Sequence, residues 1–154
     1  MSLRTRLTAT AFALGVAAAA MPLAASPAQA ASMHGCSYPN VCLYKGSYTT
    51  GTIWGRYQDP GYQSMPTAYR NVTDAVVNTR NDDSVWLLDT GPSPDRYICI
   101  PRKTAVNLGA YAHPNGGTWA NDVDVINIWQ PSDNGLCSGT TQVRQGSKPD
   151  GWRP

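Results

Sequence analysis

The feature that most constrains the fold is a succession of short apolar runs, each interrupted after a few residues by Gly, Pro, Asn or Asp. Few segments have helical periodicity, whereas alternating or β-branched and aromatic runs are typical of strands. All ten acidic residues are Asp, which favours turns over helices. Strands this short and closely spaced indicate an all-β sandwich or barrel. Six strands are predicted, at residues 41–44, 51–57, 74–78, 85–88, 97–100 and 124–129.

Two stretches resemble one another at a distance of fifty residues. Asn71-Val72-Thr73-Asp74-Ala75-Val76 and Asn121-Asp122-Val123-Asp124-Val125-Ile126 share Asn, Asp and an apolar pair in register. Each follows a predicted strand, Cys42-Leu43-Tyr44 in the first case and Trp86-Leu87-Leu88 in the second. One interpretation is a chance similarity of two strand starts. The other is a pair of Greek-key motifs packed as pseudo-symmetric halves.

The first thirty residues are typical of an export signal. Arg4 and Arg6 precede a stretch without formal charge at residues 7–23, and Ala28-Gln29-Ala30 offers small residues to a signal peptidase. The stretch is less apolar than the roughly 20 residues that span a bilayer. We therefore predict a signal peptide at residues 1–30 and a secreted, extracellular protein with no membrane segment left after cleavage.

The remaining 124 of the 154 residues have the size of one domain. We place this domain at residues 31–137, followed by a polar C-terminal tail at residues 138–154, and expect a monomer. Two of the 12 basic residues would leave with the signal, so ten basic residues balance ten acidic ones. Without a basic cluster, nucleic acid is not expected as a partner.

Four cysteines remain, which in an exported chain implies two disulfides. Three pairings are possible, and the sequence alone does not choose among them. Cys36–Cys42 with Cys99–Cys137 is favoured because the first pair closes a short turn. A zinc site is disfavoured because Cys99 and Cys137 stand alone, without closely spaced ligands.

Three features together resemble the secreted βγ-crystallin-like peptidase inhibitors of the Streptomyces metalloproteinase inhibitor type. They are Cys36-x5-Cys42-Leu43-Tyr44, the central Ile98-Cys99-Ile100-Pro101 and the Asn121-Asp122 start of the last strand. The resemblance spans residues 36–129. It implies a two-motif Greek-key βγ-crystallin-like domain that inhibits extracellular metalloproteases of the thermolysin type.

The resemblance also implies an inhibitory reactive loop with its reactive bond at Cys99–Ile100. Ile100 would supply the large aliphatic residue that thermolysin-like enzymes prefer after the scissile bond, and a disulfide at Cys99 would restrain the loop. Two features differ from the family pattern: Cys99 has no partner nearby in the sequence, and Pro101 lacks an N–H that could bind the cleft. The alternative for Cys99 is a purely structural disulfide in a core strand. The residues of the predicted loop are Tyr97, Ile98, Cys99, Ile100, Pro101 and Arg102.

Neither a cofactor nor enzymatic activity is expected. Many βγ-crystallin domains bind calcium, but Ala75-Val76 and Val125-Ile126 replace the hydroxyl ligands of that motif, which favours turn capping by the neighbouring Asn and Asp residues. His113 is the only central histidine, and nothing in the spacing singles out a Ser or Asp partner for it. The alternative function is a secreted βγ-crystallin-like antimicrobial protein, toxin or binding module.

Overall fold

The computed structural model describes residues 32–128, 137 and 141–148, and the regular secondary structure of this part of the chain consists mainly of short strands. Two 3-10 helices, η1 (Thr67–Tyr69) and η2 (Leu108–Ala110), lie between strands. The all-β prediction is therefore confirmed. The strands are β1 (Val41–Lys45), β2 (Thr52–Tyr57), β3 (Gly61–Ser64), β4 (Ala75–Asn78), β5 (Val85–Asp89), β6 (Arg96–Ile100), β7 (Thr104–Asn107), β8 (Val125–Ile128) and β9 (Arg144–Ser147).

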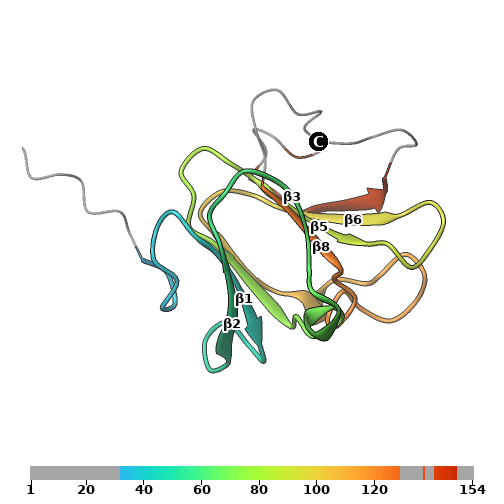
Figure 1. Ribbon diagram of the computed structural model, residues 1–154, viewed down its shortest axis with the longest axis horizontal. Helices are drawn as coiled ribbons and strands as arrows, with labels where there is room; N and C mark the ends of the chain where they lie inside the picture. The colour runs from blue at the N-terminus through green and yellow to red at the C-terminus, as the bar shows by residue number, and fades with distance from the viewer. Residues whose placement is uncertain (1–31, 129–136, 138–140, 149–154) are drawn as a thin grey trace, which may run out of the picture.

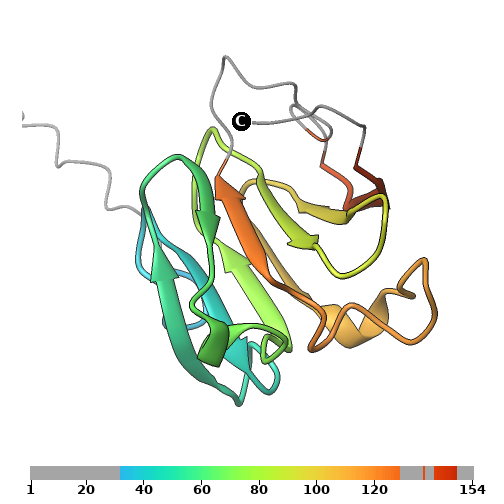
Figure 2. The ribbon, with the colours of Figure 1, turned by 45° about the vertical axis from the view of Figure 1, so that its right-hand side comes forward.

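The strands form two antiparallel sheets that face one another as a sandwich (Figures 1 and 2). One sheet has the order β2-β1-β4-β7 and the other has the order β3-β8-β5-β6-β9. In the first half of the chain, β1, β2 and β4 share a sheet while β3 crosses to pair with β8. In the second half, β5, β6 and β8 share a sheet while β7 crosses to pair with β4. Each half therefore contributes one strand to the sheet of the other.

Strands β1 and β5, which both lie inside their sheets, are buried on both faces. Val41 and Leu43 of β1 point into the main core between the sheets, whereas Cys42 and Tyr44 belong to a second cluster on the outer face. In β5, Leu87 points into the main core and Trp86 to an outer cluster that includes Cys99 and Cys137. Because both faces are covered, these strands are continuous apolar runs rather than alternating ones.

The sequence repeat corresponds to a repeat in the structure. Asn71 and Asn121 both have left-handed backbone conformations, with φ of 57° and 63°. The N–H of Asn71 donates to the carbonyl of Val123 (3.0 Å), and the N–H of Asn121 donates to the carbonyl of Thr73 (2.9 Å). These reciprocal bonds join the two halves at equivalent positions.

The aspartates of the repeat cap turns, as the sequence predicted. Asp74 Oδ2 accepts the N–H of Gly46 (2.7 Å), and its Oδ1 accepts a side-chain N–H of Asn121 (2.9 Å). Asp124 Oδ2 accepts the N–H and the hydroxyl of Thr90 (3.0 and 2.8 Å). Each carboxylate thus stabilises the turn that follows the first strand of its half.

The six predicted strands are all present, with ends that differ by at most one residue, but the sequence did not indicate three others. Strands β3, β7 and β9 have four residues each and lie at sheet edges, where all but one of their residues are at least partly exposed. Such strands need no apolar run, so the pattern does not reveal them. The boundary placed after residue 137 is corrected by β9, because residues 144–147 pair with β6 (Figure 1). The predicted signal peptide at residues 1–30 lies outside the described residues.

Both disulfides of the favoured pairing are present. Cys36–Cys42 joins the segment before β1 to β1 itself, with 5.8 Å between the Cα atoms. Cys99–Cys137 joins β6 to a residue 38 positions further along the chain, with a Cα–Cα distance of 6.0 Å. The described part of the chain holds no helix with the length and apolar character that a membrane crossing requires.

Removing the two disulfides separately should destabilise the protein unequally. Cys99–Cys137 closes 38 positions and Cys36–Cys42 only six. Chain entropy therefore predicts losses of about 4 and about 2 kcal/mol in the free energy of unfolding. Urea unfolding of the Cys99→Ala/Cys137→Ala and Cys36→Ala/Cys42→Ala variants measures both values. Equal losses would show that loop length does not determine the contribution of these disulfides.

Candidate functional site: the turn between β6 and β7

The structure places most of the predicted reactive loop in a strand. Tyr97, Ile98, Cys99 and Ile100 belong to β6, and the last three of them are fully buried. The expected geometry is therefore corrected: the Cys99–Ile100 bond lies inside a sheet and is not presented on an exposed loop. Of the six predicted residues, only Pro101 and Arg102 belong to the connection that leads to β7.

Strand pairing on both sides explains this burial. Cys99 lies opposite Trp86 of β5 and opposite Arg144 of β9, while Ile98 and Ile100 point into the main core. The pairing of β9 depends on residues that were predicted to be a tail, so the sequence could not show that β6 is an inner strand. Cys99 thus has the structural disulfide in a core strand that was the alternative interpretation.

The exposed element next to these residues is a tight turn of three residues, Pro101–Lys103, which we call the basic turn. Pro101 is buried, whereas Arg102 and Lys103 are exposed, and Lys103 has a left-handed φ of 52°. The turn carries the chain from one sheet of the sandwich to the other, because β6 and β7 belong to different sheets. The hydroxyl of Thr104 donates to the carbonyl of Arg102 (3.0 Å).

The buried side chain of Asn78 forms hydrogen bonds to the basic turn and to the residue before it. This side chain is fully buried at the end of β4. Its Nδ2 donates to the carbonyls of Asp83 (2.9 Å), Pro101 (3.1 Å) and Ile100 (3.4 Å), while its Oδ1 accepts the N–H of Arg80 (3.1 Å). One amide therefore satisfies backbone groups of the turn and of the β4–β5 connection, groups that would otherwise be buried without partners.

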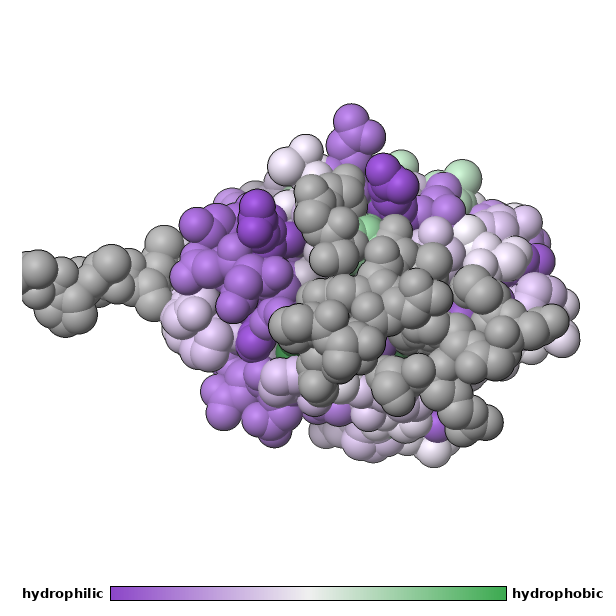
Figure 3. All heavy atoms as spheres, turned by 90° about the horizontal axis from the view of Figure 1, so that it is seen from above, coloured by the Kyte–Doolittle hydropathy of each residue, from purple (hydrophilic) through white to green (hydrophobic). Residues whose placement is uncertain are grey.

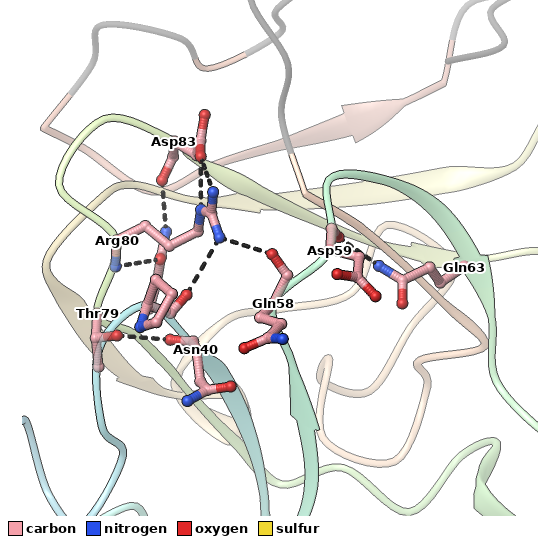
Figure 4. Close-up of polar contacts among 9 residues, drawn as sticks. Asn40, Gln58, Asp59, Gln63, Thr79, Arg80 and Asp83 are labelled. Carbon is pink, nitrogen blue, oxygen red and sulfur yellow. Dashed lines mark hydrogen bonds and ion pairs between the residues drawn. The ribbon is translucent and has the colours of Figure 1, made fainter.

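Arg80 forms the second layer of this support (Figure 4). The N–H of Lys103 donates to its carbonyl (3.2 Å). The Arg80 guanidinium pairs with Asp83 and donates to the carbonyls of Pro39 (3.2 Å) and Gln58 (2.9 Å). The side chains of Arg80 and Asp83 are only 12% and 11% exposed, so this pair is shielded from solvent. Arg80 thus connects the turn to Pro39 before β1, to Gln58 after β2 and to Asp83 before β5.

These supporting residues were missed by the sequence analysis. Asn78 ends an otherwise apolar strand, and a polar residue at a buried strand end is a weak signal for such a role. Arg80 and Asp83 stand in a polar connection with the composition of an ordinary turn. Their partners are up to 41 positions away in the chain, so only the folded arrangement identifies them.

His113 is buried beside Asp89 and Trp119. Nδ1 accepts the N–H of Asn115 (3.2 Å), and Nε2 lies 3.3 Å from Oδ2 of Asp89, although the two atoms are not aligned as a hydrogen bond. The ring packs edge-on against Trp119, with 4.5 Å between the centroids. Burial raises the pKa of Asp89 above its ordinary value, and the N–H of Gly91 and the nearby His113 oppose that shift.

No group of three or more His, Cys, Asp or Glu side chains lies close enough to hold a metal ion within residues 32–128, 137 and 141–148. On the face seen in Figure 3, the visible described residues are mostly hydrophilic, and hydrophobic residues appear only in small separate areas. No family model, curated protein or solved structure matches the chain.

Asn78→Ala should destabilise the protein markedly. The substitution leaves buried carbonyls of Asp83, Ile100 and Pro101 without this donor. We expect a loss of about 1–3 kcal/mol in the free energy of unfolding, measured by urea titration. Asn40→Ala is the matched control, because the Asn40 side chain bonds only to the exposed Ser37. A loss for Asn78→Ala as small as that of the control would contradict the proposed support.

Asp89→Asn should change how stability depends on pH. Because the pKa of Asp89 is raised in the folded state, the folded protein holds this proton more tightly than the unfolded chain does. This contribution to stability is present below the ordinary Asp pKa of about 3.9 and is lost as the pH rises through the folded value. The free energy of unfolding of the wild type minus that of the variant should therefore decrease between pH 3 and pH 7. A difference that is constant or increases would contradict the raised pKa.

Proposed function

We propose that this protein is a secreted, non-catalytic peptidase inhibitor of the βγ-crystallin-like class. It acts as a monomer outside the cell and docks on an extracellular peptidase through the basic turn. The proposal keeps the function that the family resemblance implies, but it moves the contact from the buried Cys99–Ile100 bond to the exposed end of the predicted segment.

The strand order supports the crystallin-like part of the proposal. In each half, the fourth strand lies beside the first and the first beside the second, as in a Greek key. The third strand of each half joins the sheet of the other. Two such motifs sharing one core are the arrangement that the resemblance implies. Of the segments that carry the resemblance, Cys42-Leu43-Tyr44 lies in β1 and Asn121-Asp122 lies just before β8.

The observation that carries the inhibitor proposal is the hydrogen bonding of the backbone of the basic turn. Three consecutive carbonyls, those of Ile100, Pro101 and Arg102, and the N–H of Lys103 are all hydrogen-bonded within the protein. The turn starts directly after a disulfide-bonded inner strand and leads into β7, which is paired with β4. A surface element that is already ordered loses little conformational entropy on docking, which is the property that tight inhibitors exploit.

The first test is titration of the purified, oxidised mature protein against thermolysin, subtilisin and trypsin. Stoichiometric inhibition of at least one of the three would support the proposed function. The reduced and alkylated protein serves as the control, because it lacks the disulfides that hold the scaffold. Absence of inhibition for all three peptidases would overturn the proposal.

A binding module is the second candidate, and two exposed tyrosines favour it. Tyr62 and Tyr69 are 41% and 48% exposed, and they are the large hydrophobic residues on the surface of the described part of the chain. The Tyr69 ring stacks on Trp54 with 5.2 Å between centroids and an interplanar angle of 6°. An ordered aromatic ring at the surface suits contact with a protein or a carbohydrate. Ligand binding that is lost in Tyr69→Ala and unchanged in Arg102→Ala would favour this candidate.

A further inference from the structure

We infer that the basic turn selects a peptidase with an acidic specificity pocket, of the trypsin-like class, rather than a thermolysin-like metalloprotease. This inference rests on the proposed function, because it names the partner of the same turn. Its basis is the identity of the side chains that the turn presents and the absence of partners for them among residues 32–128, 137 and 141–148.

The aliphatic residue required by a thermolysin-like enzyme is not accessible. Ile100 is fully buried in the main core, and Pro101 after it is buried as well. Exposing Ile100 would require it to separate from Val85 of β5 and its side chain to leave the main core. The first side chain that projects into solvent after the disulfide is that of Arg102.

Arg102 and Lys103 are adjacent cations that are free to bind a partner. Among the residues that the structure describes, neither side chain makes an ion pair or a hydrogen bond. The neighbouring Arg80 differs, because its guanidinium is fully engaged with Asp83 and two carbonyls. An acidic pocket could therefore accept Arg102 without breaking an interaction inside the inhibitor, and a buried pairing of guanidinium with carboxylate is among the strong charge-assisted contacts.

The backbone conformation of the turn also affects whether the peptidase could cleave it. Lys103 has φ of 52°, so the chain bends directly after Arg102 instead of continuing as an extended strand. Peptidases bind their substrates in an extended form, so the Arg102–Lys103 bond would not be aligned for cleavage. The turn should fill the specificity pocket and block the cleft while its own peptide bond stays intact.

The experiment compares trypsin, thermolysin and subtilisin with the wild-type protein and four variants, Arg102→Ala, Arg102→Lys, Lys103→Ala and Lys45→Ala. Lys45 is the matched control: it is an exposed Lys at the other end of the sheet, since Val41 and not Lys45 pairs with Asn78. Near-UV circular dichroism and urea unfolding show whether each variant keeps the fold. Intact-mass measurement after incubation shows whether the Arg102–Lys103 bond is cut.

We expect stoichiometric inhibition of trypsin with the chain intact. Arg102→Ala should raise the inhibition constant at least about 100-fold, which corresponds to about 2.7 kcal/mol. Arg102→Lys should weaken inhibition less than Arg102→Ala, because the ammonium group keeps the positive charge but loses the bidentate pairing of the guanidinium with a carboxylate. Lys103→Ala should have a smaller effect than Arg102→Ala, and Lys45→Ala should behave as the wild type.

Four results would overturn the inference. Inhibition of thermolysin or subtilisin but not trypsin would reject the acidic pocket and leave the proposed function standing. Equal inhibition of trypsin by the wild type and Arg102→Ala, or rapid cleavage after Arg102, would show that the turn does not act as an inhibitory contact. No inhibition of any peptidase would reject the proposed function together with the inference.

Discussion

The exchange of one strand between the two halves of the chain is the constraint on which the rest of this structure depends. β3 completes the sheet of the second half and β7 completes the sheet of the first, so neither half encloses its core alone. The reciprocal backbone bonds of Asn71 and Asn121 secure the exchange at equivalent points. Because these contacts join distant parts of the chain, the two halves must close their shared core together, at the entropic cost of long loops.

The same exchange creates the candidate site. The connection from β6 to β7 must cross from one sheet to the other, and Pro101–Lys103 makes that crossing within three residues. A crossing this short brings backbone carbonyls close to the core, where they need donors. Asn78 provides one at the end of β4, and Arg80 adds a second layer that reaches Pro39 and Gln58. The hydrogen bonding to which we assign a functional role is therefore a consequence of how the sandwich is connected.

Sequence reasoning succeeded where burial imposes a pattern and failed where it does not. β1 and β5 were evident because both of their faces are covered, and the repeat at Asn71 and Asn121 was evident because the same turn geometry recurs. Edge strands such as β9 were missed because they need few apolar residues. That omission had a direct consequence for the site: without β9, the segment around Cys99 looked like a loop that could reach a protease cleft, whereas the structure buries it between two strands.

The sequence by itself determined the all-β class, the six strands with the strongest apolar runs, and the turn-capping role of the repeated aspartates. These follow from local preferences and from periodicity, which each short segment expresses on its own. Only the tertiary structure decided which strands are inner ones, that Ile100 is buried, and that Arg102 is the side chain presented beside it. Those properties depend on which distant segments cover each face and edge, and that information is absent from any single stretch of the chain.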